Sequence, residues 1–216
     1  MEDRLSSRRT IVDRIVNELF NPTTAEKQRL GDMLARVELY NRSPTIVYHD
    51  IHHLYAVVIN SYKLGKIAGL TNSDLKLLFI AALFHDFNHS YGNLNDTINV
   101  ASSISAFTNL FTKNGQFASM FTREEIEIIS DAIFCTVFPF RVEPKNKIEE
   151  CLRQADLTMS FEEDAELFAQ GLTAEFKTAG KDITATVPDM NSFVKQTDPS
   201  VFIAWEQVKQ QQWWNE

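Results

Sequence analysis

The chain has few residues that break helices and few that form crosslinks. Glycine and proline account for only 7 and 6 of its 216 residues, which argues against a β-rich fold dense in turns. Two cysteines, Cys135 and Cys151, are too few for a disulfide framework or a cysteine-based zinc site, and we expect both as thiols in a reducing compartment.

Membrane-spanning and targeting segments are also missing from the sequence. No apolar run approaches the length that crosses a bilayer. The first residues lack the basic-then-apolar order of a signal peptide. These absences predict a soluble, cytoplasmic protein that does not act at a membrane.

Basic residues are outnumbered, with 21 lysines and arginines against 29 acidic residues and a formal net charge of −8. Such a balance argues against a broad nucleic-acid interface. A small anionic substrate would need local positive charge, which bound metal ions supply. The hydrophobic share of 44%, with 16 phenylalanines, is ample for a packed core.

Apolar residues recur at helical spacing along most of the chain. Three segments, Thr23–Glu26, Thr71–Asp74 and Thr122–Glu125, have the form of an N-terminal capping box. The expected helices cover residues 6–20, 24–40, 45–64, 75–87, 96–111, 122–137, 144–160, 161–178 and 190–214, the last interrupted at Asp198-Pro199. The sequence therefore predicts one all-α domain over residues 1–216, a compact bundle of eight or nine helices.

Histidines are confined to two short segments, which is the main chemical signal. The apolar run Ala81–Phe84 ends in His85-Asp86, with His89 three residues on. The other segment holds His49, His52 and His53, and on the expected helix His49 and His53 share a face. An ordinary packing role suits any single histidine, but the set of imidazoles and carboxylates favours a metal site.

Asp156 is the best candidate for a ligand from later in the chain. It lies between apolar neighbours on an expected helix, and a buried carboxylate without a partner is costly. A metal ion or a salt bridge to lysine or arginine would each satisfy it. A mixed histidine and aspartate site admits Mn²⁺, Fe, Zn²⁺, Mg²⁺ or Ni²⁺, with one or two ions per chain.

These motifs together resemble the HD-domain metal-dependent phosphohydrolases, from about Tyr40 to Phe176. The segments Tyr48–His53, Ala81–His89 and Ala155–Leu157 are similar to signatures of class I cyclic-nucleotide phosphodiesterases. Small bacterial predicted HD phosphohydrolases share the same pattern, followed by pairs similar to Asn95-Asp96 and Glu175-Phe176. The resemblance implies an HD-type helical domain with a motif core at about residues 40–176.

The resemblance also implies roles for single residues. It makes His53, His85, Asp86 and Asp156 the metal ligands, with Asp86 bridging to a second ion. It makes His49 the acid that protonates the leaving group and places His89 near the bridging solvent, so the catalytic set is His49, His89 and Asp86. Tyr48 and Asn95 are the candidate substrate contacts.

The expected activity is metal-dependent hydrolysis of a phosphoester bond in a nucleotide-like substrate. A cyclic-nucleotide phosphodiesterase is the sharpest form of this hypothesis. A nucleotide phosphatase or triphosphohydrolase and a non-catalytic nucleotide-binding HD domain are the alternatives. The C-terminal Trp213-Trp214 pair is expected to pack against the domain, with a subunit contact in a homo-oligomer or a cover over the site as alternatives.

Overall fold

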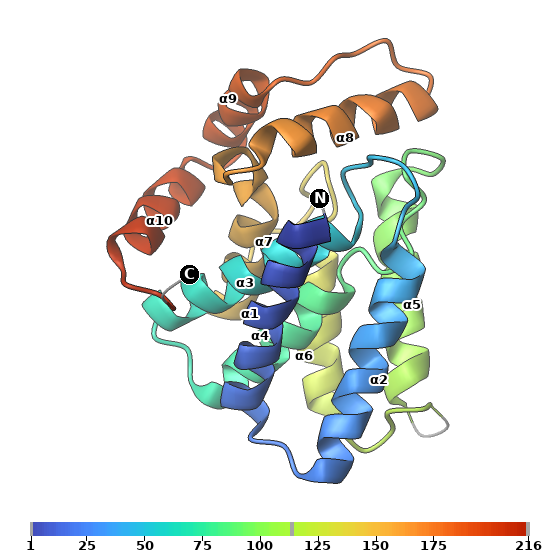
Figure 1. The fold of residues 1–216 in the computed structure, drawn as a ribbon, viewed down its shortest axis with the longest axis vertical. Helices are drawn as coiled ribbons and strands as arrows, with labels where there is room; N and C mark the ends of the chain where they lie inside the picture. The colour runs from blue at the N-terminus through green and yellow to red at the C-terminus, as the bar shows by residue number, and fades with distance from the viewer. Residues whose placement is uncertain (1, 113–114, 215–216) are drawn as a thin grey trace.

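Helices make up all the regular structure in residues 2–112 and 115–214, the parts of the chain that the computed structural model describes (Figure 1). The elements are α1 (Glu2–Phe20), α2 (Thr24–Asn41), α3 (Ile51–Ile67), α4 (Asn72–Phe84), α5 (Asp96–Phe111), α6 (Arg123–Phe134), α7 (Lys147–Asp156), the 3₁₀ helix η1 (Leu157–Phe161), α8 (Ala165–Thr178), α9 (Val187–Thr197) and α10 (Pro199–Gln210). The predicted all-α class is confirmed, and the described residues form ten α-helices where eight or nine were expected.

Local capping explains where several helices begin. In α2, α4 and α6 the threonine at the N-cap accepts the backbone N–H of the acidic residue three positions on, and that residue's carboxylate accepts the threonine's own N–H. These reciprocal bonds satisfy two backbone groups that the first turn would otherwise leave unpaired. The three predicted capping boxes are confirmed, and α5 has the predicted bounds Asp96–Phe111.

Other predicted bounds are wrong for identifiable reasons. The expected helix over residues 45–64 begins only at Ile51, because Asp50 caps it there. The interruption expected at Asp198-Pro199 is confirmed, since Pro199 lacks the N–H that a continuous helix requires and Asp198 caps the new start, although the two helices cover residues 187–197 and 199–210 rather than 190–214. The segment 144–160 similarly divides into α7 and the start of η1.

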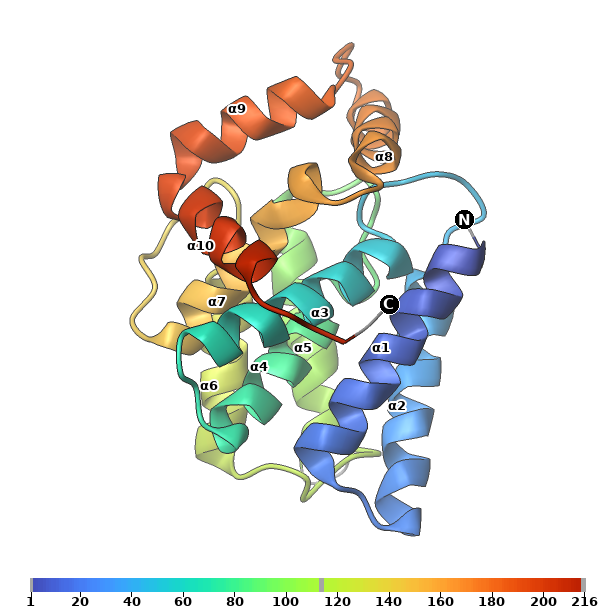
Figure 2. The ribbon, with the colours of Figure 1, turned by 60° about the vertical axis from the view of Figure 1, so that its left-hand side comes forward.

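The centre of the molecule is formed by α3 and α4, which pack against each other. Most of their residues are buried all round the helix, as is typical of helices enclosed by others. The helix α1 packs on one side of α3, and α6 and α7 pack on the other side of the pair (Figure 2). No helix within the described ranges is both long and apolar enough to traverse a bilayer.

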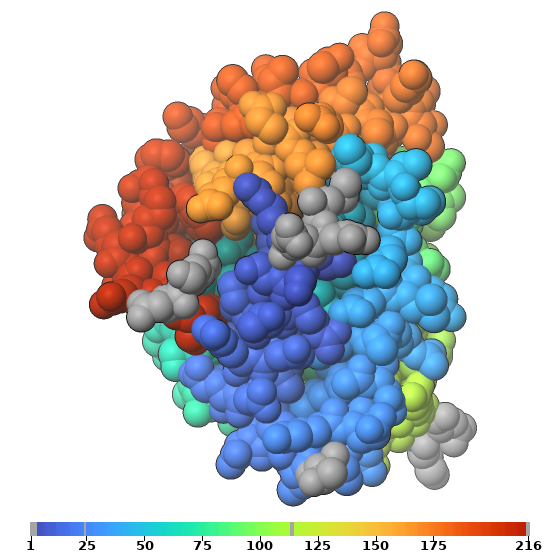
Figure 3. Space-filling view, in the orientation of Figure 1, coloured from blue at the N-terminus to red at the C-terminus, as the bar shows by residue number. Residues whose placement is uncertain are grey.

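The C-terminal helices α8 and α9 lie across one end of the bundle, and α10 runs down its side against α3 and α7, shown in orange and red in Figure 3. There α8 comes close to the segment that precedes α3, through Gly171. A Cβ atom at Gly171 would lie 2.5 Å from the carbonyl carbon of Val47 and 2.6 Å from the nitrogen of Tyr48. Only glycine permits this approach, which brings the residues before α3 under α8.

Candidate metal centre

The start of α3 fixes the position of His53. Asp50 at the N-cap has an extended backbone, and its Oδ1 accepts the N–H groups of His52 at 2.9 Å and His53 at 3.4 Å. His53 therefore lies in the first turn of α3, with its side chain fully buried. His49 precedes the cap and is outside the helix, so the prediction that it shares a helix face with His53 is wrong.

His85 and Asp86 follow directly after α4, in a tight turn held from α2. Asn41, at the end of α2, donates to the carbonyl oxygen of Asp86 at 2.7 Å and accepts the N–H of Asn88 at 3.2 Å. Asn88 has a φ of +58°, a conformation that asparagine tolerates better than most residues. The turn thus aims both the imidazole and the carboxylate away from the apolar run.

Four ligand atoms converge from these elements and from Asp156, the last residue of α7. His53 Nε2 lies 3.2 Å from Asp86 Oδ2 and 3.2 Å from Asp156 Oδ1. His85 Nε2 lies 3.0 Å from Asp86 Oδ2, 3.5 Å from Asp156 Oδ1 and 3.2 Å from His53 Nε2. We call His53, His85, Asp86 and Asp156 the metal cluster; one ligand atom from each lies within 4.8 Å of the others.

These separations match the edges of a coordination polyhedron. An ion with bonds of about 2.1 Å holds adjacent ligand atoms about 3.0 Å apart in an octahedron and about 3.4 Å apart in a tetrahedron. Without a cation, the two imidazole Nε2 atoms, 3.2 Å apart, would face each other as two lone pairs or two N–H groups unless they shared a proton. The donor set therefore fits a divalent ion.

The tautomer of His85 also suits a metal. Its Nδ1 lies 2.8 Å from the carbonyl oxygen of Ala82, so Nδ1 donates and Nε2 keeps its lone pair for a ligand bond. His53 has no such support, because its buried Nδ1 lacks a hydrogen-bond partner among the described residues. Its ring is held instead by contact with Tyr48, at a centroid distance of 4.8 Å.

Within the metal cluster, burial and the neighbouring charges shift the pKa of each group in opposite directions. Burial raises the pKa of Asp86, but the neighbouring His85 and His49 outweigh it and hold the pKa well below its usual range. Burial lowers the pKa of His85, yet Asp86 and Asp156 raise it well above 6.5. The carboxylates of the cluster are therefore ionised and attract positive charge, whether protons or a metal ion.

A second group, His49, His89 and Glu175, lies beside the first. Glu175 of α8 accepts the N–H of Tyr48 at 2.8 Å and of His49 at 2.9 Å through Oε1, and its Oε2 lies 2.6 Å from His49 Nδ1. The other ring nitrogen, His49 Nε2, lies 4.0 Å from Asp86 Oδ2. Although burial lowers the pKa of His49, Glu175 and Asp86 raise it to about 9.

His89 stacks on His49 with ring centroids 3.9 Å apart. Its Nδ1 accepts the N–H of Tyr91 at 3.0 Å, and its Nε2 lies 2.8 Å from the side-chain nitrogen of Asn99. Burial and the adjacent His49 lower the pKa of His89 to about 3. Within the stacked pair the pKa of His49 is thus raised and that of His89 is lowered.

A cavity of about 680 Å³ opens over both groups. The residues that line it include Asp156 of the metal cluster, all three members of the second group, and Tyr48. The apolar and polar residues of its walls include Leu94, Asn95, Asp96, Phe138, Phe140, Phe176, Lys181, Ile183, Asp189 and Phe193. The cavity gives a bound molecule access to the metal cluster through Asp156.

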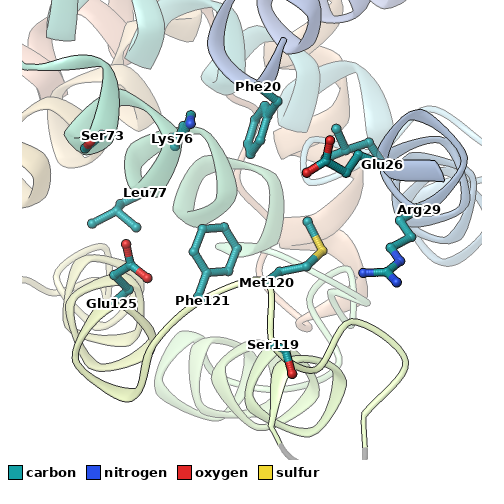
Figure 4. A pocket seen from close by; sticks show the side chains of 11 residues that line it. Phe20, Glu26, Arg29, Ser73, Lys76, Leu77, Ser119, Met120, Phe121 and Glu125 are labelled. Atoms are coloured by element: carbon teal, nitrogen blue, oxygen red, sulfur yellow. The ribbon is translucent and has the colours of Figure 1, made fainter. Parts of the chain in front are cut away.

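A second cavity, of about 310 Å³, lies at the far end of the bundle, among the starts of α2, α4 and α6 (Figure 4). Its carboxylates are Glu26 and Glu125, which close the capping boxes of α2 and α6. Both groups of described residues able to hold a metal lie at the larger cavity. The candidate metal ligands among the described residues therefore lie at the larger cavity and not at this one.

The structure brings most of the sequence-predicted site residues to one place. His53, His85, Asp86 and Asp156 form the metal cluster, and His49, His89 and Tyr48 lie directly beside it. Asn95 lines the cavity while its side chain caps α5 by accepting the N–H of Ile98 at 3.0 Å.

The contacts of Asp156, His52 and Trp214 distinguish between the roles that the sequence left open. Asp156 forms ion pairs with His53 and His85, and none with a lysine or arginine among the described residues. His52 belongs to neither group, and burial together with nearby Arg8 lowers its pKa to about 4. Trp214 stacks on Tyr62 with centroids 5.4 Å apart, so the packing role expected for this end of the chain is confirmed.

Sequence reasoning missed the supporting residues. Glu175 appeared only as part of a resemblance, although it makes three contacts with Tyr48 and His49. Asn99 and Gly171 were not singled out. A buried glutamate in an otherwise apolar helical stripe was the one local signal for Glu175.

Comparison with known proteins adds no family assignment, since no family model matches the chain and no curated protein matches it significantly. The all-helical fold and the buried histidine and aspartate residues that could hold a metal ion are compatible with an HD domain.

Proposed function

We propose that this protein is an HD-type, metal-dependent phosphohydrolase that cleaves a phosphoester bond of a nucleotide-like substrate. One observation carries the proposal. The four ligand atoms of the metal cluster converge beside His49, whose Nδ1 lies 2.6 Å from the carboxylate of Glu175, at a cavity of about 680 Å³. Cyclic nucleotides are the first substrates to test.

In this proposal His53, His85, Asp86 and Asp156 would hold the metal. A divalent ion bound there would supply Lewis-acid charge to the phosphoryl oxygens and lower the pKa of a water molecule. Burial of the cluster strengthens this effect, because electrostatic interactions grow as water is excluded.

His49 then supplies the proton for the departing oxygen. Glu175 occupies its Nδ1, so the proton available for transfer is at Nε2, on the side of Asp86. A pKa of about 9 keeps that proton in place at neutral pH. A group that can donate a proton at the operating pH is what an alkoxide leaving group needs.

Glu175 and His89 position His49 rather than react themselves. Glu175 fixes the backbone of Tyr48 and His49 and contacts the ring at Nδ1, and His89 stacks on one face of that ring. His89 is in turn held by the N–H of Tyr91, which donates to its Nδ1. A ring fixed on two sides keeps its Nε2 at one place beside the metal cluster.

The test is a survey of activity with the metal-loaded protein. Samples loaded with Mn²⁺, Fe²⁺ or Zn²⁺ are incubated with a panel of cyclic and linear nucleotides, and the products are resolved by chromatography. The proposal expects hydrolysis that disappears when the metal is removed. Fully loaded protein that binds nucleotides but hydrolyses none of the panel would establish the non-catalytic alternative instead.

A further inference from the structure

Exposed apolar side chains gather at the mouth of the larger cavity. Leu94, Phe138, Ile183 and Phe193 are 48%, 44%, 49% and 41% exposed, and all four line the cavity. They come from the loop before α5, the α6–α7 loop, the loop before α9, and α9 itself. Apolar groups concentrated at one opening mark a surface that contacts a ligand.

The phenylalanines of this rim contact one another. The rings of Phe138 and Phe140 lie 5.7 Å apart, and those of Phe138 and Phe193 lie 5.2 Å apart, both edge to face. We call Phe138, Phe140 and Phe193 the aromatic lip. It joins the α6–α7 loop to α9, so two separate segments of the chain form one apolar surface.

Arg153 anchors the lip to the helix that carries Asp156. This arginine is buried in α7, and its guanidinium carbon lies 4.3 Å from the centre of the Phe140 ring. It also donates to the carbonyl oxygens of Cys135, at 3.2 Å, and Val142. The loop that bears Phe138 and Phe140 is thus held at both ends from α7.

The charged side chains that line the cavity disfavour binding of a highly anionic ligand. Among the described residues that line it, Lys181 is the only lysine or arginine, against the four carboxylates of Asp96, Asp156, Glu175 and Asp189. Chains of phosphates are held in proteins by several arginine or lysine side chains or by oriented backbone N–H groups. A metal ion held by the metal cluster would neutralise one phosphoryl group, and the other residues that line the cavity offer only Lys181 for additional negative charge.

Resting on the proposed function, we propose that the substrate is an ester of a single phosphoryl group with a bulky, largely apolar organic part, which the aromatic lip recognises. The phosphoryl group lies at the metal cluster, and the organic group lies against Phe138 and Phe193. Nucleoside diphosphates and triphosphates are poor ligands because only Lys181 faces their additional charges.

Binding of non-hydrolysable probes tests the lip without requiring turnover. The affinities of methylphosphonate, phenylphosphonate and 1-naphthylphosphonate for Mn²⁺-loaded protein are measured by calorimetry. We expect affinity to rise along the series, by at least about tenfold from methyl to naphthyl, since each ring buries more apolar surface. Phe193→Ser should remove most of this gain, and Phe138→Ser should do the same.

The control is Phe202→Ser, which alters a phenylalanine of similar exposure, 39%, on α10 outside the cavity, and it should leave the gain intact. Equal affinities across the series in the wild type, or a gain that survives both lip substitutions, would overturn the inference. Hydrolysis of phenyl p-nitrophenyl phosphate by the same samples reports on the proposed function separately. If the protein hydrolyses this ester but binds all three phosphonates equally, only the recognition role of the aromatic lip is refuted. If affinity rises along the series but no ester is hydrolysed, only the proposed hydrolase activity is refuted.

Discussion

Replacing Glu175 by glutamine removes a charge while keeping a shape. Glutamine retains the Oε1 that accepts the N–H groups of Tyr48 and His49, so the segment before α3 stays in place. What is lost is the carboxylate oxygen 2.6 Å from His49 Nδ1. That carboxylate is the largest of the influences that raise the pKa of His49 to about 9.

The size of the effect follows from the protonated fraction of His49. With a pKa of about 9, roughly nine-tenths of His49 is protonated at pH 8, and with an ordinary value of about 6.5 only about 3% is. Glu175→Gln should therefore lower turnover by up to about 30-fold at pH 8. At pH 6 both forms are mostly protonated, and the loss should be less than about twofold.

Two measurements check this reasoning. The alkaline limb of the pH–rate profile should move toward acid by up to about 2.5 pH units, with little change below pH 6. NMR titration of the His49 ring in metal-free protein should show the same downward shift in pKa without any turnover. Glu166→Gln, the same change at an exposed position of α8, serves as the control. An unchanged His49 pKa in Glu175→Gln would refute the assignment of Glu175 as its partner.

Two further substitutions separate catalysis from packing. His49→Ala should keep its metal and lose about 10²–10⁴-fold in turnover, with a smaller loss on p-nitrophenyl esters, whose leaving group scarcely needs a proton; equal losses on both esters would remove the acid role. Gly171→Ala should lower the free energy of unfolding by about 1–3 kcal/mol because its Cβ meets the backbone of Val47, whereas Gly31→Ala, with nothing within 4 Å, should be neutral or stabilising in chemical denaturation. A stable Gly171→Ala would contradict the close approach of α8.

Local signals in the sequence predicted most of the fold. Capping boxes at Thr23, Thr71 and Thr122 act within four residues, so their sequence pattern is sufficient to place a helix start. The start of α3 was missed because the apolar and histidine pattern was extended back through Asp50. An aspartate directly before an apolar run is itself an N-cap signal, and in the structure Asp50 is the N-cap of α3.

In the candidate site, too, some residues could be predicted from the sequence and others could not. The metal cluster could be predicted because histidine and aspartate are costly to bury without a partner, so their positions in apolar runs are informative. The role of Glu175 could not be predicted, because it depends on contacts with Tyr48 and His49, which lie 127 and 126 positions earlier in the chain. Only the fold brings α8 to the segment before α3, and Gly171 shows how closely they approach.

The metal content of the purified chain tests the central claim most directly. After incubation with Mn²⁺, Fe²⁺ or Zn²⁺ and removal of free ions, elemental analysis should find at least one ion per wild-type chain. Asp86→Ala should lose most of it, while Asp189→Asn, a carboxylate change at the cavity but outside the metal cluster, should retain it. A wild type that stays metal-free under saturating concentrations of all three ions, or an Asp86→Ala variant that binds as much as wild type, would contradict the account.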